Sequence, residues 1–454
     1  MTATIGVRDS GGDPLAYRRA IEALRSGVPS WDAVAVLGSG QAEVEDRFSA
    51  LLERFAGPDR PADVPGGPAA RPGRAGGQAG LLLGGGFGAG KSHLLAHLAS
   101  LAMSSGFAAS TVVISKETPF YDPAKTYRAA IESALDPGRA RGVLADAAAD
   151  LDPDTSRYAD FSRWVNSPTS GMDERFAATL LCHERLRGGR AAGADEAVDA
   201  LVRFWAGEPI RVSDLRRALK SVGAAGLFEF RPLPAAELAR QRFRFAARLM
   251  RASGRAGWVI FFDEVELIGR YSLLQRGRSY AEVARWLGAS LAPADGELPL
   301  IPVLAMTDDF EEAVLAGKSD RALLPAKLRA KSTAEWDETA ALAEAGMRHI
   351  ELNMLHLTPP DDAELDRAYA ALKRLHGEAF GWSPPDVCGL ERLGATRMRQ
   401  YVRAWINEWD LVRLDPEFLP QTEVVQIAAD YSEDSALEGV TVDEVAPDGV
   451  AEAG

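Results

Sequence analysis

The segment Gly85–Ser92 constrains the fold of this chain more than any other part of its sequence. Its residues, GGFGAGKS, fit the pattern GxxxxGK[ST]. A short apolar run, Leu81–Leu83, precedes it, and apolar residues at helical spacing follow from Lys91. Glycines between a buried strand and a helix let backbone N–H groups surround phosphate oxygens, and the helix N-terminus adds partial positive charge. The sequence therefore predicts a phosphate-binding loop in an α/β fold. The candidate nucleotide-binding residues are Gly85, Gly86, Phe87, Gly88, Ala89, Gly90, Lys91, Ser92 and His93.

A second apolar run, Trp258–Phe262, ends in the acidic pair Asp263 and Glu264. An aspartate at the carboxyl end of a buried parallel strand points toward the phosphate site and can hold Mg²⁺ together with the Ser92 hydroxyl. A neighbouring glutamate can polarise an attacking water as general base. Paired with the loop upstream, these residues predict Walker A and Walker B motifs, with ATP and Mg²⁺ as ligands and Lys91 reaching the β- and γ-phosphates.

Further polar residues follow a third apolar run, Leu300–Met306. Thr307 is the candidate for contacting the γ-phosphate and the attacking water, and a polar strand end at a turn is the alternative. Arg321 and Arg329 are candidates for an arginine finger acting on a neighbouring subunit. Arg399, preferred over Arg397, is the candidate sensor of the γ-phosphate. Solvated surface charge is the alternative for each arginine.

The chain divides by composition and periodicity into a P-loop core flanked by helical segments. Strand, helix and strand in succession predict a parallel sheet, with five strands expected, the last at His349–Leu352. Gly57–Ala79 is expected to be a flexible loop because 11 of its 23 residues are Gly or Pro. The predicted units are an N-terminal helical segment (1–56), the loop (57–79), an AAA+-like ATPase core (80–358) with a helical insertion (121–255), a helical lid (361–414) and a disordered acidic tail (421–454).

The net charge and the cysteine content limit which partners and which cellular compartment we expect. The net charge is −14, and the segment after Gln421 contains nine Asp and Glu residues but no Lys or Arg. This acidity argues against DNA binding by a uniformly basic surface, but does not exclude DNA as a partner. Two distant cysteines exclude a disulfide framework or zinc ribbon and favour a reducing cytoplasm. No apolar stretch is long enough to span a membrane. His93 and His97 lie i, i+4, but with no third ligand near they are expected to be structural.

Three segments together carry a family resemblance. GGGFGAGKSH, VVISKETPFYDPAKTYRAAIESAL and WVIFFDEVELIGRYSLLQRGRSY resemble the BrxD-like ATP-binding proteins of BREX (bacteriophage exclusion) systems, which are AAA+-type P-loop ATPases. The resemblance extends from Ala16 to about Leu414. It implies nucleotide binding at the loop glycines, Lys91 and Ser92, Walker B roles for Asp263 and Glu264, and phage resistance alongside other BREX-system proteins. It implies no role for Gln275, Arg276 or Arg278, for which a solvated helix face and a contact with DNA or a neighbouring subunit remain open.

Three functions are compatible with these residues. The first is a Mg²⁺-dependent ATPase that remodels a protein–DNA complex, acting alone or as a homo-oligomer. The second is a nucleotide-gated switch or scaffold that binds ATP with little turnover. The third is a DNA-binding regulator, because five arginines lie between Leu390 and Arg413.

Overall fold

A computed structural model describes residues 14–27, 31–56, 79–136, 142–187, 194–288, 298–387, 398–415, 417 and 431–434. Apart from Ala79, the Gly/Pro-rich loop lies outside these residues, as do Arg397 and most of the acidic tail. Within the described parts of the chain, no helix is both long and apolar enough to cross a membrane.

The centre of the molecule is a five-stranded parallel sheet of order β2-β3-β4-β1-β5. The inner strands form because their apolar runs are buried on both faces. Strand β4 lies between β1 and β3, with Gly84 opposite Met306. The carboxyl ends of the strands that carry the Gly-Lys-Ser loop, Thr307 and the Asp-Glu pair therefore lie side by side. The strands are β1 (Leu81–Gly84), β2 (Ala108–Val113), β3 (Trp258–Asp263), β4 (Leu300–Met306) and β5 (Met354–His356).

The prediction of a strand at His349–Leu352 is wrong. These residues end the helix α14 (Ala334–Asn353), and the fifth strand follows directly as β5. Ala343, Met347 and Ile350 are buried at helical spacing, so burial of this helical face overrides the short apolar run.

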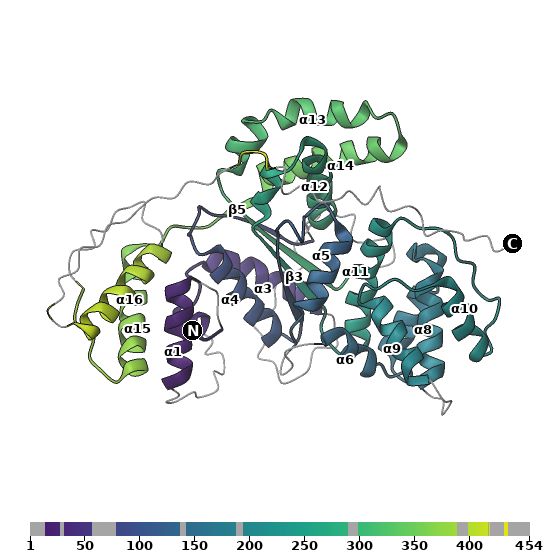
Figure 1. Ribbon diagram of the computed structural model, residues 1–454, viewed down its shortest axis with the longest axis horizontal. Coiled ribbons are helices and arrows are strands. Elements are labelled where there is room, and N and C mark those ends of the chain that lie inside the picture. The colour runs from purple at the N-terminus through teal and green to yellow at the C-terminus, as the bar shows by residue number, and fades with distance from the viewer. Residues whose placement is uncertain are drawn as a thin grey trace.

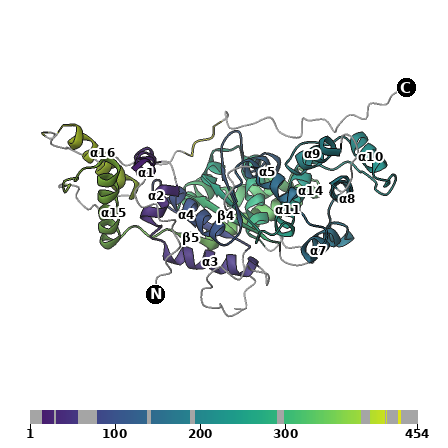
Figure 2. The same cartoon turned by 90° about the horizontal axis from the view of Figure 1, so that it is seen from below.

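Helices cover both faces of the sheet, and alternate strand residues enter two different cores. On one face, Leu81 and Leu83 pack with α3 and α4. On the other, Leu82 and Ile260 pack with α5, α11 and α12. Figure 2 shows α3 and α5 on opposite sides of the strands. The helices introduced so far are α3 (Ala42–Ala56), α4 (Lys91–Ser104), α5 (Pro123–Glu132), α11 (Ala235–Ala252) and α12 (Leu273–Leu287).

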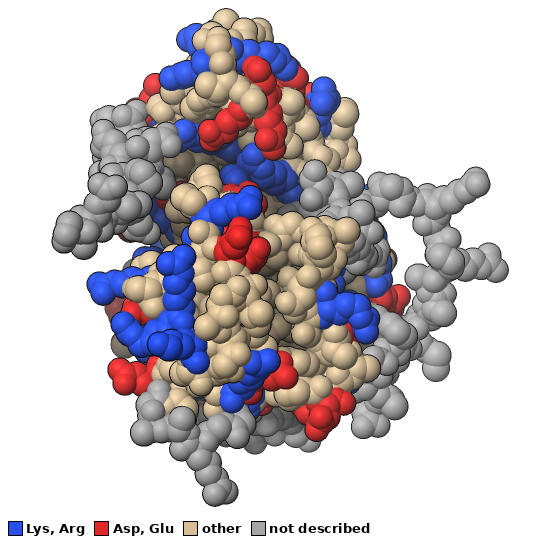
Figure 3. Space-filling model, turned by 90° about the vertical axis from the view of Figure 1, so that its right-hand side faces the viewer, with Lys and Arg blue, Asp and Glu red and all other residues tan. Residues whose placement is uncertain are grey.

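Between β2 and β3, where a helical insertion is predicted, the described residues form helices and no further strand. These helices extend to one end of the molecule, where α8, α9 and α10 form a small core of their own (Figure 1). On that end, Lys and Arg side chains lie in separate groups with acidic side chains between them (Figure 3). The further elements are α6 (Val143–Ala149), α7 (Ser156–Val165), η1 (Pro168–Ser170), α8 (Glu174–Arg187), α9 (Ala194–Trp205) and α10 (Val212–Ser221).

The opposite end combines helices from both ends of the chain (Figure 1). Helices α1 (Pro14–Ser26), α15 (Asp362–Phe380) and α16 (Met398–Leu414) share one core, to which α2 (Trp31–Leu37) contributes Ala33. The N-terminal segment is therefore divided, because α3 packs on the sheet while α1 packs on α15 and α16.

Helices α12, α13 (Asp320–Arg329) and α14 pack together beyond the carboxyl ends of the strands (Figure 1). The Gln-Arg-Gly-Arg-Ser-Tyr segment that begins at Gln275 lies on α12, and its first arginine is not on a solvated face. The Arg276 guanidinium is 3% exposed and donates to both carboxylate oxygens of the fully buried Asp320, at 2.8 and 2.9 Å. Gln275 completes the capping box of α12, and Arg278 stacks on the Trp336 ring. This segment therefore joins α12 to α13 and α14.

Candidate functional site

The Gly-Lys-Ser loop connects β1 directly to α4. Gly88 and Gly90 have φ angles of 80° and 98°, which L side chains rarely adopt, so glycine is required for the turn. The Gly85 N–H donates to the Met306 carbonyl at 3.1 Å, which places the beginning of the loop against the end of β4. Lys91 is the first residue of α4, and Ser92 follows it at the same N-terminus. The local geometry is that of an anion-binding helix start.

Lys91 is buried and its ammonium group turns back into the loop. Its Nζ donates to the carbonyls of Gly85 at 2.7 Å and Gly86 at 3.4 Å. It also lies 3.9 Å from the Glu266 carboxylate. The loop carbonyls and this carboxylate therefore hold the ammonium beside the turn. Phosphate oxygens bound in the loop would be stronger partners for it than neutral carbonyls, since both members of that pair are charged.

Asp263 and Glu264 follow the last buried residues of β3. Asp263 is 6% exposed, and its carboxylate accepts the Glu264 N–H at 2.9 Å. Glu264 has a φ of 59°, an uncommon conformation for a residue with a side chain and one found preferentially at functional sites. Burial and the neighbouring charge of Asp263 raise the pKa of the Glu264 carboxyl, while Lys91 and Arg399 act in the opposite direction.

Glu266 is a member of this group that the sequence analysis missed. It lies in the short helix η2 (Val265–Arg270), one turn past Asp263. Burial raises the pKa of its carboxyl to about 7, although Lys91 partly offsets that effect. Its Oε2 atom is buried without a hydrogen-bond partner. The signal available in the sequence was the repetition of Glu two residues after Glu264, and one sequence gives no reason to prefer the second acid.

Thr307 follows β4, between the strands that lead to Lys91 and to Asp263. It is 1% exposed. Its hydroxyl forms a short hydrogen bond with the phenol of Tyr431, a residue from the C-terminal tail. The sheet order thus brings Lys91, Asp263, Glu264 and Thr307 to one edge of the sheet.

One of the candidate arginines acts electrostatically on Glu264. Arg399, on α16, donates to the Gly27 carbonyl at 2.5 Å and is close enough to lower the pKa of Glu264. Arg321 pairs instead with Glu311 of the turn η4 (Glu311–Ala316) and with Glu351 of α14. Arg329 pairs with Glu344 at 3.0 Å. Both α13 arginines are roughly half-exposed, on the outside of the molecule.

The two histidines of α4 contact the N-terminal helices. His93 Nε2 lies 2.7 Å from the Gly38 carbonyl, and His97 pairs with Glu45 at 3.1 Å. Burial lowers the pKa of the His93 ring. His93 thus contacts the segment after α2, and its place among the candidate nucleotide-binding residues stays a prediction.

The oxygen donors at this edge suit Mg²⁺. The Ser92 hydroxyl and the Asp263 carboxylate are the ligand types that this ion takes, usually one or two from the protein, with phosphate oxygens and water completing the shell. Among the described residues, no cluster of three or more His, Cys, Asp or Glu side chains could hold a metal ion.

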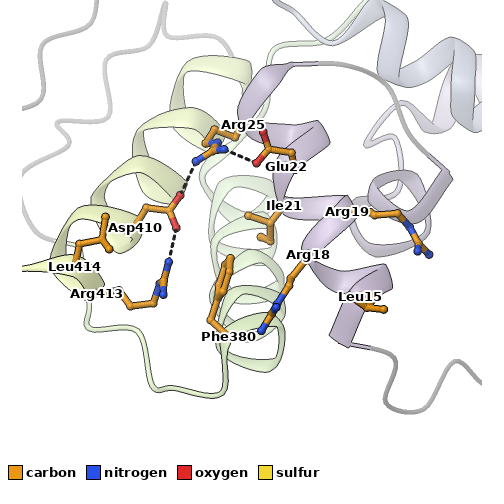
Figure 4. Close-up of a pocket in the computed structure, with 10 residues that line it drawn as sticks. All are labelled: Leu15, Arg18, Arg19, Ile21, Glu22, Arg25, Phe380, Asp410, Arg413 and Leu414. Atoms are coloured by element: carbon orange, nitrogen blue, oxygen red, sulfur yellow. Dashed lines mark hydrogen bonds and ion pairs between the residues drawn. The ribbon is translucent and has the colours of Figure 1, made fainter.

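A surface pocket lies elsewhere, between α1, the end of α15 and α16 (Figure 4). None of the predicted site residues lines it. The Phe380 ring lies between the guanidinium groups of Arg18 and Arg413, and Asp410 pairs with Arg25. These contacts join the N-terminal helix to the C-terminal helices. The lining residues are Leu15, Arg18, Arg19, Ile21, Glu22, Arg25, Phe380, Asp410, Arg413 and Leu414.

Comparison with known protein families gives a match over part of the chain. Residues 74–145 match the family model described as BREX system ATP-binding protein BrxC/D. The match supports a BREX ATP-binding protein of the BrxC/D type. It includes the whole Gly-Lys-Ser loop, α4 and β2, and ends before the Asp-Glu pair. The five-stranded parallel sheet is compatible with a P-loop NTPase core. No curated protein and no solved structure matches the chain.

Proposed function

We propose that the chain is a Mg²⁺-dependent ATPase acting in a BREX-type phage-resistance system, where hydrolysis remodels a protein–DNA complex. The observation that carries the proposal is the convergence of Lys91, Asp263, Glu264 and Thr307 at one edge of the sheet, because β4 separates β1 from β3. The family match supports ATP as the nucleotide. An AAA+ architecture, with α15 and α16 as its lid, is part of the same proposal.

Each residue has a task in the proposed reaction. The loop N–H groups and Lys91 bind the β- and γ-phosphates, and Lys91 exchanges its carbonyl partners for phosphate oxygens. Ser92 and Asp263 would hold Mg²⁺, which neutralises charge on the phosphates. Glu264 accepts a proton from the attacking water, and burial, which raises the pKa of its carboxyl, makes it a better base than an exposed glutamate. Thr307 orients that water.

Two arginine roles complete the proposal. Arg399 is the sensor of the γ-phosphate, since it already lies within electrostatic reach of Glu264. Arg329 is the finger that acts on a neighbouring copy in a homo-oligomer, because it is exposed and Glu344 is its one ion-pair partner among the described residues. Arg321 is less suited, since two carboxylates hold it.

Hydrolysis by the purified full-length chain tests the proposal. Wild type, Lys91→Ala and Glu264→Gln are compared with and without duplex DNA, and Glu184→Gln in the helical insertion is the matched control for loss of a glutamate charge. We expect ATP turnover in wild type and the control, and none in the two site variants. ATP binding without turnover in wild type under every condition would instead favour a nucleotide-gated switch. Stimulation by DNA would support nucleic acid as part of the substrate.

A further inference from the structure

Four residues of the acidic C-terminal tail are bound at the edge of the sheet that carries the candidate site. Tyr431–Asp434, here termed the strap, contacts η2, α12 and the residues that follow β4 (Figure 1, the short yellow segment near α13). The expectation of a disordered tail is not met for these four residues, because side chains distant in sequence hold them.

The tyrosine of the strap is seated on the core by its ring and its hydroxyl. The ring lies edge-on to Phe310, with centroids 6.2 Å apart. A Cβ atom at Gly269 would lie 2.9 Å from Tyr431 Cδ1, so the absence of a side chain at Gly269 makes room for the ring. The phenol bonds both to Thr307 Oγ1 and to Asp309 Oδ1, the latter at 2.7 Å.

The two acidic residues of the strap meet two arginines. Glu433 pairs with Arg276 at 2.7 Å, and Asp434 pairs with Arg270 at 2.8 Å. The Asp434 N–H also donates to the Arg270 carbonyl at 3.1 Å. Aromatic, ionic and backbone contacts thus fix the strap in one register.

The Tyr431 contact occupies the Thr307 hydroxyl, the group to which the proposed reaction assigns the attacking water. The Tyr431 phenol stays protonated, because burial raises its pKa, and it donates to the Asp309 carboxylate. Thr307 then donates its own proton to the phenol oxygen. A threonine hydroxyl has a single proton to donate, so Thr307 cannot also donate to a phosphate oxygen or a water.

We infer that the strap is a tethered inhibitor of the candidate ATPase site, docked within its own chain through Tyr431 on Thr307 and released before hydrolysis. This inference rests on the proposed function and adds its regulation. Departure of the strap makes the Thr307 hydroxyl and the Arg270 guanidinium available to other groups, so a partner that binds the strap would activate hydrolysis.

The test compares steady-state ATP hydrolysis by full-length wild type, Tyr431→Phe and the double variant Glu433→Gln/Asp434→Asn. Tyr158→Phe is the matched control, since the Tyr158 phenol also donates to a carboxylate, that of Glu184 at 2.7 Å, far from this edge in the helical insertion. Removing the two hydrogen bonds of the phenol in Tyr431→Phe weakens docking by roughly fivefold to 150-fold. We expect kcat to rise several-fold in both strap variants, with KM for ATP and the Tyr158→Phe kinetics unchanged.

Hydrogen exchange of the Asp434 amide measures whether the strap is docked, since that amide is bonded to Arg270 in the docked state. It therefore distinguishes failure of the inhibitor proposal from failure of the ATPase proposal. Faster exchange in Tyr431→Phe together with higher kcat supports the strap. Faster exchange with an unchanged or lower kcat overturns inhibition while leaving the ATPase proposal intact. ATP binding without turnover in wild type and in both strap variants overturns the ATPase itself, and inhibition with it. Acceleration that depends on protein concentration would show docking between copies and overturn docking within one chain.

Discussion

The buried pair of Arg276 and Asp320 supports a quantitative prediction for Asp320→Asn. The carboxylate accepts three hydrogen bonds, two from the Arg276 guanidinium and one from the Tyr280 phenol at 2.8 Å. Asparagine keeps the shape but loses the charge and one acceptor. The guanidinium, 3% exposed, would retain Glu433, whose side chain is 58% exposed, as its one acidic partner among the described residues.

Breaking a buried ion pair on one side costs about 3–5 kcal/mol, because an uncompensated charge remains away from water. Glu433 keeps part of that compensation, so we expect a loss of about 3 kcal/mol in the free energy of unfolding. Equilibrium urea denaturation followed by tryptophan fluorescence measures it. The control is Asp214→Asn, whose exposed pair with Arg217 spans 3.1 Å and is worth about 1 kcal/mol or less.

A second variant distinguishes loss of the pair from general damage. Arg276→Met in the Asp320→Asn background leaves no buried charge, so stability should recover most of the difference from wild type. A loss below about 1 kcal/mol for Asp320→Asn, equal to that of the control, refutes the reasoning. So does a double variant less stable than the single one.

Three further predictions concern the site and its surroundings. The pKa of Glu266 in the folded protein, about 7, lies above its ordinary value, so the free energy of unfolding falls as pH rises from about 4.5 to 7. Glu266→Gln should therefore stabilise the protein above pH 7 by up to about 3 kcal/mol, as measured by urea denaturation, and an equal effect at pH 4 would contradict this. Ser319 has a φ of 55°, so Ser319→Gly should raise the free energy of unfolding by about 1 kcal/mol, whereas a loss would show that the serine side chain outweighs the strain. Arg399→Ala should lower kcat on the order of 10²-fold, while Arg403→Ala, one turn along the same exposed helix face, should leave kcat unchanged. Equal effects of the two changes would show that Arg399 is not the γ-phosphate sensor.

The sequence was sufficient where a local pattern decides the structure. The run Leu300–Met306 is β4 from end to end, and Trp258–Phe262 is β3 apart from its last residue. Both are fully buried, and burial on both faces leaves a continuous apolar run in the sequence. His349–Leu352 was mistaken for a strand because a short apolar run does not distinguish strand from helix, although Ala343, Met347 and Ile350 had the helical spacing.

The contacts that the sequence could not predict join residues far apart in the chain. Arg276 and Glu433 are 157 positions apart, and Arg270 and Asp434 are 164 apart. The sequence around each of these residues does not indicate that it is paired, since a charged residue on a helix is usually solvated. The strap and the burial of Arg276 therefore emerge only from the three-dimensional arrangement.

The position of β1 in the sheet has a consequence during synthesis of the chain. Its two neighbours, β4 and β5, are both made later, and Leu300 follows Gly84 by 216 residues. At about 5–20 residues per second, the ribosome needs on the order of 10–40 s to add them. During that time β1 has neither partner, so the phosphate-binding loop cannot acquire its native geometry. Each newly made copy thus passes through a period in which nucleotide cannot assist its folding and in which both sides of β1 are unpaired.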